Sequence, residues 1–436
     1  MPEDARSTRL DELHLWFLGQ PTAPQWVGEL RLMTVGKGVS LTYAPTWLDN
    51  GFALSEDLPL VATEHLPRAN GVAAGAVDDA RPDRWGERVI QFIDKPKRLS
   101  LMEYLYHAGD DRFGALGVST SKTQYLPRLN GPLPRLQNAQ ALSEAVAKVN
   151  ARQPVNAIER RLLAAGGSLG GAKPKALIDI DGQPWVIKFF NNEPIDAPLV
   201  EHASMTLARK AGITTAETQV IPLIGENALA VRRFDRVNGW RVHCISAGTA
   251  LRALAAPGQE PDLGYPNLAQ LLRRAGVAAD NANQRDMRDL FRRMVFNILI
   301  DNTDDHEKNH ALMVVEPYRH GSLRLAPAYD VLPTNSGQGH QEFAVGSLGR
   351  DSTLANAMSQ CALFGLQPTD ATDEIAKVIA VVGRWLKHFK ACGVTRADID
   401  SLAQRIDGDE LRAQRRDFRA ADYRAPANKR PRNPFG

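Results

Sequence analysis

The stretch DNTDDHEKNH, residues 301–310, gathers carboxylates, asparagines and two histidines within ten positions of this 436-residue chain. It lies between the apolar run 295–300 and a second apolar run, ALMVV at 311–315. A loop that only faces solvent rarely carries such a set between two buried elements, because each buried polar group needs a partner. The stretch therefore predicts a catalytic or metal-binding loop, and two chemistries compete for it.

The first chemistry is that of a zinc hydrolase, because residues 306–310 contain the pattern HExxH. On an α-helix this spacing places His306 and His310 on one face, where they bind zinc while Glu307 serves as general base. However, the acidic residues at 301–305 are a poor start for a helix, and the run at 311–315 predicts a strand where the helix should continue. The zinc hydrolase stays open as an alternative.

The second chemistry is phosphoryl transfer, in which a catalytic aspartate is followed closely by an asparagine that holds magnesium. Asp304 and Asn309 have this relationship, five positions apart. Such a loop predicts a second metal-binding aspartate downstream, and Asp330 stands there in LAPAYDVLP at 325–333. Carboxylate and carboxamide oxygens suit Mg²⁺, a hard cation that prefers oxygen ligands.

A glycine-rich segment, AAGGSLGGAKPK at 164–175, precedes a predicted hairpin whose turn is Asp181-Gly182. The segment matches neither the Walker A pattern nor GxGxxG, although its backbone N–H groups are of the kind that cradles phosphates. Lys188 lies in the second strand of the hairpin, VIKFF, where a buried lysine needs an anionic partner. Glu201, on the predicted helix 198–211, is a candidate to hold that lysine in place.

The remaining pattern is a β-rich first half followed by a helical second half. Strands are predicted at 13–18, 26–33, 39–43, 176–180, 185–190, 218–222 and 228–232. Helices are predicted at 82–95, 100–108, 143–150, 157–165, 198–211, 267–275 and 286–300, and the remainder from 335 to about 406 is also expected to be helical. A polar, proline-containing stretch at 119–137 predicts a domain boundary.

Composition places the chain among ordinary globular proteins, with 43% hydrophobic and 24% charged residues. No apolar run approaches the ~20 residues that a membrane-spanning helix needs. The N-terminal residues are acidic where a signal peptide would be basic, and the three cysteines form no CxxC pair. We therefore expect a cytoplasmic protein without a membrane segment, a disulfide framework or a cysteine-rich zinc site.

The net charge of +3 is unevenly distributed along the chain. Residues 411–436 hold eight Arg and Lys against two Asp, a net charge of +6, so residues 1–410 sum to −3. Three prolines and the absence of an apolar pattern predict that 411–436 is a disordered basic tail. Such a tail usually serves solubility, and contact with nucleic acid is the less common role.

At these motifs the sequence resembles the HipA family of bacterial serine/threonine kinases, the toxins of type II toxin–antitoxin systems. The strings SLGGAKPKALI, VIKF, RRFDR, NTDDHEKN and LAPAYDVLP match the family motifs in order, and the resemblance covers most of the chain. It implies an α+β, two-lobed protein-kinase-like fold, related to phosphatidylinositol kinases. The implied division is a β-rich N-terminal subdomain at 1–125, an ATP-binding N-lobe at 126–250, a helical C-lobe at 251–410 and the tail at 411–436.

The resemblance also implies roles for individual residues. Asp304 is expected to be the general base, Lys188 to contact the ATP phosphates, and Asn309 and Asp330 to hold Mg²⁺. The other expected ATP contacts are Gly170, Gly171, Ala172, Lys173, Pro174, Lys175, Arg232, Arg233, Phe234, His306, Tyr329 and Asp330. Ser168 matches the autophosphorylated serine of the family, whose modification would add about −1.5 to −2 charge beside the phosphate loop and switch the enzyme off.

The family further implies partners. Its members phosphorylate aminoacyl-tRNA synthetases, notably the glutamyl enzyme, and a small DNA-binding antitoxin of the HipB type neutralises them. DNA contact is then expected only within the antitoxin complex. Lys173 and Pro174 depart from the family's phosphate loop, as do Asp305 and Arg232 from the residues seen at their positions in some members. A small-molecule or lipid kinase of the same fold, and a non-catalytic nucleic-acid-binding module, remain as alternatives.

Overall fold

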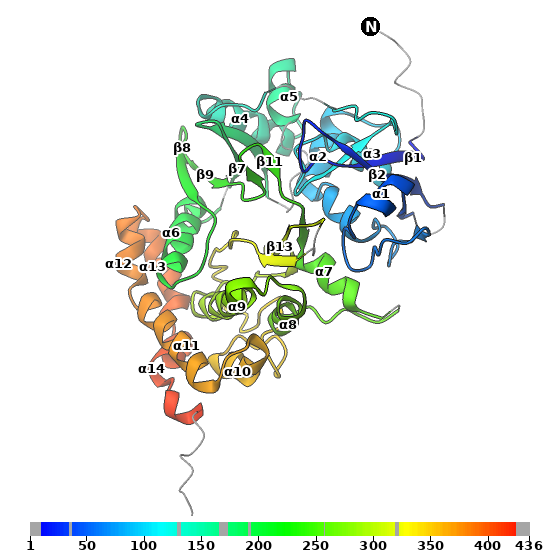
Figure 1. Ribbon diagram of the computed structural model, residues 1–436. Helices are drawn as coiled ribbons and strands as arrows, with labels where there is room; N and C mark the ends of the chain where they lie inside the picture. The colour runs from blue at the N-terminus through cyan, green and yellow to red at the C-terminus, as the bar shows by residue number, and fades with distance from the viewer. Residues whose placement is uncertain are drawn as a thin grey trace, which may run out of the picture.

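The structure is a computed structural model with three parts arranged around a central junction (Figure 1). It describes residues 10–34, 37–128, 132–164, 173–190, 193–256, 258–318 and 322–423. A β-rich N-terminal subdomain lies beside an N-lobe built on a second sheet, and a helical C-lobe completes the molecule. The expected α+β, two-lobed architecture is confirmed.

The N-terminal subdomain is built on an antiparallel sheet of five strands in the order β4-β3-β2-β1-β5. The strands are β1 (Glu12–Phe17), β2 (Gln25–Leu32), β3 (Val39–Tyr43), β4 (Glu64–His65) and β5 (Leu116–Ser119). Leu13, Leu15, Val27 and Leu41 are fully buried and supply one face of the core. The apolar residues that predicted the first three strands therefore serve as their packing surface.

Short helices complete this subdomain, and one of them also packs against the N-lobe. They are α1 (Pro45–Asn50) between β3 and β4 and, after η2 (Gly75–Ala80), α2 (Arg84–Ile93) and α3 (Leu101–His107). Ser100 and Glu103 form a capping box at the start of α3, which explains why that helix begins where the sequence predicted. Trp85 and Val89 of α2 pack into the hydrophobic core of the N-lobe, so α2 belongs structurally to both parts.

The N-lobe sheet has the strand order β6-β7-β9-β8, and each pair of adjacent strands is antiparallel. The strands are β6 (Lys175–Ile180), β7 (Gln183–Phe189), β8 (Thr218–Pro222) and β9 (Asn227–Arg232). The turn between β6 and β7 has φ values of +53° at Asp181 and +76° at Gly182, as a two-residue hairpin turn requires. Helix α6 (Ala197–Lys210) packs on one face, while α4 (Ala139–Asn150) and α5 (Ala157–Ala164) lie on the other.

The C-lobe surrounds a three-stranded sheet with mostly helical structure. The sheet consists of β12 (Cys244–Ser246), β13 (Ala311–Val315) and β14 (Ser322–Leu325). Its helices are α7 (Ala247–Leu254), α8 (Tyr265–Ala275), α9 (Ala282–Leu299), α10 (Leu354–Ser359), α11 (Pro368–Val382), α12 (Trp385–Ala391), α13 (Arg396–Ile406) and α14 (Asp409–Asp417). The described helices include none with the length and apolar character needed to traverse a membrane.

Two predictions about the second half of the chain are wrong in part. Residues 335–353 form no helix, because glycines with positive φ, Gly337, Gly339 and Gly349 among them, punctuate this segment. The predicted basic tail is not a free tail over its first part, since 411–423 form most of α14 and η7 (Ala420–Tyr423). Leu411 is buried there, and Phe418 stacks on Tyr423 with ring centroids 5.6 Å apart. Residues 424–436 lie outside the described residues.

Candidate active site

Lys188 is the centre of the charged cluster at the junction of the two lobes. It lies on β7 and is 7% exposed, in register with Lys175 on β6. Its Nζ donates to Glu201 Oε1 on α6 and to Asp330 Oδ1 in the C-lobe, and both distances are 2.7 Å. Because Glu201 is fully buried, the N-lobe holds the lysine rigidly while the C-lobe supplies the second carboxylate.

The pKa values follow from this arrangement. Burial opposes the charge on Lys188, but the carboxylates of Asp330 and Glu201 outweigh it and raise the pKa of the lysine. Burial raises the pKa of Glu201, although Lys188 partly offsets that effect. Burial likewise disfavours the charge on Asp330, but Lys188 and Lys175 hold the pKa of that carboxyl well below its usual range. Asp330 is therefore ionised, as a metal ligand must be.

Asp330 occupies an unusual backbone position. It follows β14 and has φ of +59°, the left-handed region that non-glycine residues rarely adopt. The neighbouring Ala328 forms a parallel bridge with Thr215, which fixes this loop against the segment between α6 and β8. The side chain of Asp330 is 44% exposed despite its bond to Lys188, so part of it stays accessible to solvent. Such strained positions are often found at functional sites.

Asp304 and Asn309 lie on the loop between α9 and β13. Asp304 is exposed as a residue, but its carboxyl is partly desolvated, and this is the largest cause of its raised pKa. The charge of Asp330 raises the pKa further, while His306 acts to lower it. Asn309 is buried, and its Nδ2 donates to the backbone oxygen of Asp304 at 3.3 Å. The bond uses the amide nitrogen of Asn309, so it does not occupy the oxygen that would bind a metal. The structure thus joins Lys188 to Asp330, 142 positions later, and places Asp304 close enough to Asp330 for their charges to interact.

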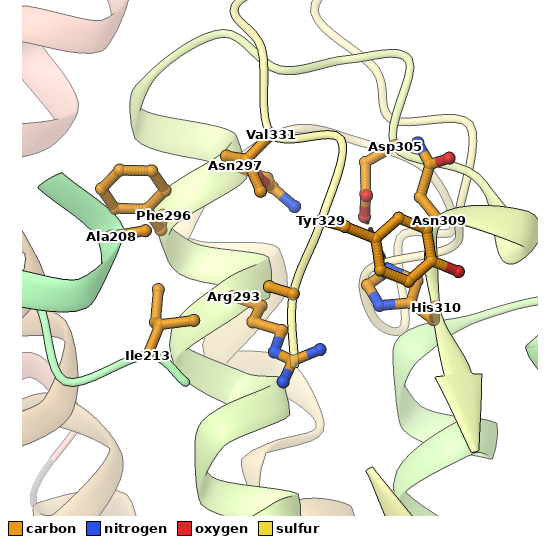
Figure 2. A pocket seen from close by; sticks show the side chains of 11 residues that line it. Ala208, Ile213, Arg293, Phe296, Asn297, Asp305, Asn309, His310, Tyr329 and Val331 are labelled. Atoms are coloured by element: carbon orange, nitrogen blue, oxygen red, sulfur yellow. Dashed lines mark hydrogen bonds and ion pairs between the residues drawn. The ribbon is translucent and has the colours of Figure 1, made fainter. Parts of the chain in front are cut away.

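A second carboxylate of the same loop, Asp305, points into the C-lobe instead (Figure 2). Its Oδ2 accepts hydrogen bonds from His310 Nε2, at 2.8 Å, and from the hydroxyl of Tyr265. Burial disfavours its charge, but His310 and Tyr265 hold the pKa of Asp305 below its ordinary value. A small cavity of about 10 Å³ adjoins this network and has room for about one water. Asp305 therefore anchors the loop at 301–310 to the interior of the C-lobe.

The HExxH pattern does not have the geometry of a zinc site. His306 precedes the single turn η5 (Glu307–Asn309) and accepts from the backbone N–H of Lys308 at 3.2 Å. His310 is bonded to Asp305 and stacks on Phe343, with centroids 5.3 Å apart. The strand β13 follows directly, so no helix places the two imidazoles on one face.

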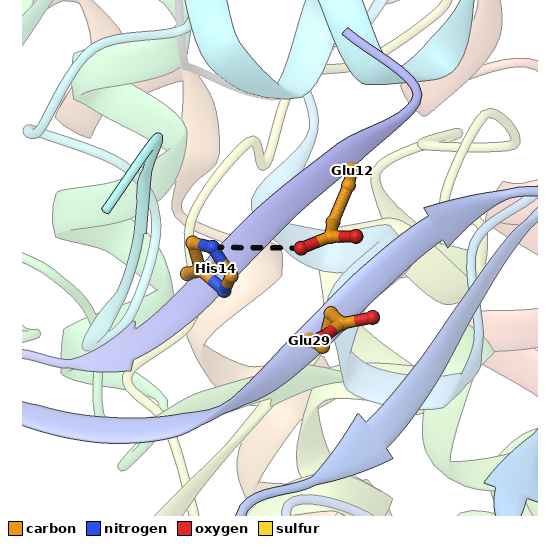
Figure 3. Close-up of side chains that lie close together, drawn as sticks. All are labelled: Glu12, His14 and Glu29. Carbon is orange, nitrogen blue, oxygen red and sulfur yellow. Dashed lines mark ion pairs between the residues drawn. The ribbon is translucent and has the colours of Figure 1, made fainter. Parts of the chain in front are cut away.

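Within the described residues, one group of three potential metal ligands lies elsewhere, in the N-terminal sheet (Figure 3). It consists of Glu12, His14 and Glu29. Glu29 Oε1 already pairs with Arg31 Nε at 2.5 Å, and His14 Nε2 is 3.8 Å from Glu12 Oε1. This group is far in sequence from the loop at 301–310 and gives the zinc interpretation no support.

Four of the expected ATP contacts, Arg232, Arg233, Phe234 and Tyr329, divide into two kinds. Phe234 stacks on Tyr329 with centroids 5.7 Å apart and an interplanar angle of 25°, and Phe113 meets Phe234 edge-on at 6.3 Å. Arg233 points away, because its guanidinium is buried against Asp235 and the backbone oxygens of residues 111 and 112. Two aromatic rings therefore mark the place where a base could stack.

Arg232 also directs its side chain away from this aromatic pair. It is exposed and pairs with Glu217 at 3.1 Å. The structure brings Phe234 and Tyr329 together, but it does not bring the side chains of Arg232 and Arg233 to the same place. Any contact of these arginines with a nucleotide is left to their backbone.

The phosphate side is described only in its last part. Ser168, Gly170, Gly171 and Ala172 lie outside the described residues. Lys173 lies 3.7 Å from Glu193 and places its Nζ 4.6 Å from the ring centroid of Phe190. The backbone oxygen of Pro174 accepts from Phe189 N at 2.9 Å, which joins the end of the loop to β7. Burial and the neighbouring charge of Lys188 lower the pKa of Lys175 to about 8.

The sequence did not single out the residues by which the N-terminal subdomain reaches this site. Trp85 Nε1 donates to the backbone oxygen of Lys175 at 2.7 Å, and Asp83 Oδ1 accepts from Lys308 Nζ at 2.8 Å. The segment PDRWGE reads only as the start of a helix, and no motif marks it as part of a site. The contacts are formed across 90 and 225 positions, which local sequence patterns do not report.

Comparison with known proteins shows which family the chain belongs to. Two protein-family models match the chain, the HipA N-terminal domain over residues 23–119 and the HipA-like C-terminal domain over residues 167–386. Two proteins of Sinorhizobium fredii, Y4dM and Y4mE, bear names that place them among the kinases. Y4dM is 33% identical over 165 residues, covering 35% of this chain and 38% of that protein, and Y4mE is 26% identical over 326 residues, covering 68% and 72%.

A solved structure has the same fold. It is the HipA chain of the Shewanella oneidensis MR-1 toxin–antitoxin complex with HipB and operator DNA. The TM-score is 0.66 at 17% identity, and the alignment covers 94% of this chain and 99% of that one. At this identity the likeness establishes the fold alone, whereas the two family models together span both the sheet-rich and the helical parts. The chain belongs to the HipA family of kinase-like proteins.

Proposed function

We propose that this protein is a serine/threonine protein kinase that uses Mg²⁺ and ATP. The observation that carries the proposal is Lys188, which lies 2.7 Å from a carboxylate of each lobe, Glu201 and Asp330. Protein kinases use a strand lysine, paired with a helix glutamate, to hold ATP phosphates beside a metal-binding aspartate. The loop with Asp304 and Asn309 lies at the same junction.

In the proposed reaction, Asp304 accepts the proton of the substrate hydroxyl. The hydroxyl oxygen forms a bond to the γ-phosphorus of ATP, and the bond from that phosphorus to the β,γ-bridging oxygen breaks to release ADP. The exposure of Asp304 suits this role, because a protein hydroxyl must reach the carboxylate from solvent. Its raised pKa makes the carboxylate a better proton acceptor than an ordinary aspartate.

The residues present fit a magnesium ion. Asn309 and Asp330 would hold it, since both offer oxygen ligands and Asp330 is ionised and partly exposed. When bound, the ion would neutralise charge on the transferring phosphoryl group. Lys188 keeps Asp330 oriented, and Asn309 is fixed through its bond to the backbone of Asp304.

The substrate and partners are proposed from family membership. We infer a protein substrate from the translation machinery, such as an aminoacyl-tRNA synthetase of the glutamyl type, and autophosphorylation at Ser168. The fold shared with HipA of a HipA–HipB–DNA complex supports a HipB-like antitoxin as partner, with DNA bound through that antitoxin. A cytoplasmic location agrees with these partners.

One experiment tests the reaction. Purified wild-type protein should transfer label from γ-labelled ATP to itself and to protein in a lysate, while Asp304→Asn should transfer none and still bind Mg²⁺-ATP. Label recovered only in small molecules or lipids would replace the protein substrate with that class. Equal transfer by wild type and Asp304→Asn would refute the proposal, and Ser168→Ala should abolish the self-labelling alone.

A further inference from the structure

The segment from Asp79 to Trp85 contacts both lobes of the kinase-like core as well as its own subdomain. It runs from the end of η2 into the first turn of α2. Three of its side chains bond to three separate parts of the core: the start of α7, the loop that carries Asn309, and the strand β6. We call Asp79, Asp83 and Trp85 the bridging segment.

Trp85 fixes the bridging segment to the N-lobe. Its indole is 1% exposed and packs with Ala176, Ile187 and Phe189 in the core under the N-lobe sheet. Its Nε1 donates to the backbone oxygen of Lys175 at 2.7 Å, at the point where the phosphate segment becomes β6. A buried indole N–H needs such an acceptor, so this contact defines where Lys175 lies relative to α2.

Asp83, at the start of α2, contacts the loop at 301–310 that carries Asp304 and Asn309, called here the catalytic loop. It stands at the N-cap of α2, yet it makes no side-chain capping bond there, and its Oδ1 instead accepts from Lys308 Nζ at 2.8 Å. Lys308 precedes Asn309, and its backbone oxygen accepts from the hydroxyl of Tyr329 at 2.8 Å. Lys308 is therefore held at its ammonium by the N-terminal subdomain and at its carbonyl by the residue before Asp330.

Asp79 fixes the other end of the bridging segment to the C-lobe. Its carboxylate accepts from the backbone N–H and the hydroxyl of Ser246, at 2.7 and 2.8 Å. Ser246 caps α7, and the backbone N–H of Ala247 bonds to the oxygen of His310 at 2.9 Å. Arg252, in the last turn of α7, pairs with Glu307 of the loop at 301–310 at 2.6 Å. The catalytic loop is thus held from both of its flanks.

We propose that the bridging segment is a positioning device for the phosphoryl-transfer site, with the Asp83–Lys308 pair as its contact to the loop that carries Asn309. The inference rests on the proposed kinase function. One rigid turn connects the strand that carries Lys175 with the loop that carries Asn309, so it sets the separation of phosphate-binding and metal-binding groups. Displacements of about 1 Å at such groups can change rates up to about 100-fold.

The contact is suited to positioning more than to folding. The side chains of Asp83 and Lys308 are 18% and 40% exposed, and ion pairs that open to solvent add little to stability. Loss of the pair should leave the fold intact while the loop relaxes. Asp83 and Lys308 are therefore positioning residues, not catalytic ones.

The test compares Asp83→Asn, Lys308→Met and the double variant in the full chain, with Asp83→Glu as the conservative variant. The readouts are the first-order rate constant of autophosphorylation at saturating Mg²⁺-ATP, written here as kcat, the Mg²⁺-ATP concentration that gives half this rate, written as KM, and the thermal midpoint. Each single variant should lower kcat/KM about fivefold to tenfold, as the loss of one charge-assisted contact allows. The double variant should lose no more than either single one, because both remove the same contact.

A matched control is Asp400→Asn, which removes an exposed ion pair with Arg396 on α13, and it should leave kcat/KM and the thermal midpoint unchanged. Additive losses in the double variant, losses that follow the fraction of unfolded protein, or full activity in both single variants would each overturn the positioning role. Asp83→Glu should recover part of the lost activity. If wild type binds no Mg²⁺-ATP and labels nothing, the proposed kinase function fails and this inference with it.

Discussion

Lys188 and Asp330 are 142 positions apart in the sequence, yet Lys188 Nζ lies 2.7 Å from Asp330 Oδ1. The same ammonium bonds to Glu201, so a single cation connects a buried N-lobe helix with the loop proposed to hold metal. Because Asp330 is partly exposed while Glu201 is fully buried, the two carboxylates are not equivalent. Removal of the lysine should expose this difference.

We expect Lys188→Met to destabilise the protein by about 3–5 kcal/mol, the typical cost of leaving a buried charge without its partner. The cost should fall mainly on Glu201, which cannot turn to solvent. Lys188→Met combined with Glu201→Gln should recover much of the loss, although neither variant should transfer phosphate. Urea unfolding followed by circular dichroism measures both, and equal stability of Lys188→Met and wild type would contradict the assignment.

The neighbouring residues Asp304 and Asp305 should respond in opposite ways. Asp304 is exposed, so Asp304→Asn should change the free energy of unfolding by less than about 0.5 kcal/mol while phosphoryl transfer disappears. Asp305→Ala should cost about 3 kcal/mol, because it leaves His310 and the Tyr265 hydroxyl without their buried acceptor. Unfolding curves with activity assays on the same samples separate the two, and Tyr265→Phe should cost only about 1 kcal/mol.

The pH dependence of nucleotide use should report Lys175. Its pKa is lowered to about 8, so the lysine loses its charge as pH rises through that value. We expect kcat/KM for Mg²⁺-ATP to fall between pH 7 and 9, since this ratio reflects groups of the free enzyme. In Lys175→Met the ratio should be lower and independent of pH over this range, and a wild-type profile that stays flat to pH 9 would exclude this role.

Stability should respond to Lys175 with the opposite sign. A group whose pKa is depressed on folding contributes stability that is present above its ordinary pKa, 10.5, and that is lost as pH falls toward 8. Stability curves of wild type and Lys175→Met should therefore converge above pH 10 and separate below it, with the variant the more stable. This comparison tests the pKa without any assay of catalysis.

The stacked pair Phe234 and Tyr329 should contribute to nucleotide affinity. Stacking of a base on an aromatic side chain is worth about 1–3 kcal/mol, so Phe234→Ala should raise the KM for ATP about tenfold with little change in kcat. Val237→Ala, at an exposed position on the nearby strand β10 (Arg236–Val237), provides the control. If Phe234→Ala instead lowered kcat alone, the ring would have a structural role beneath the site and no contact with the base.

Much of the candidate site could be predicted because its residues belong to short sequence motifs. Lys188 stands out as a charge in an apolar strand, and Asp304, Asn309 and Asp330 follow in an order that phosphoryl transfer explains. The turn at Asp181-Gly182 and the capping box at Ser100 could likewise be predicted from neighbouring residues alone. Each of these signals depends on residues a few positions apart.

The parts that sequence reasoning missed depend on distant contacts. Nothing local distinguishes Asp305, which supports the C-lobe, from Asp304 beside it. Arg233 reads as a candidate nucleotide contact, but Asp235 and two backbone oxygens bind its guanidinium inside the fold. Residues 411–423 look like a polar tail until Leu411 and the Phe418–Tyr423 stack are seen to pack.

The burial of Trp85 in the N-lobe has a consequence for how the chain is made. The pocket for its indole includes Ile187 and Phe189, which leave the ribosome about 100 residues later, or roughly 5–20 s at ordinary synthesis rates. During that interval the hydrophobic core that buries the Trp85 indole is incomplete, so the indole stays exposed to solvent in the nascent chain. Helix α2 should therefore complete its folding together with the second sheet, only after β7 has been synthesised.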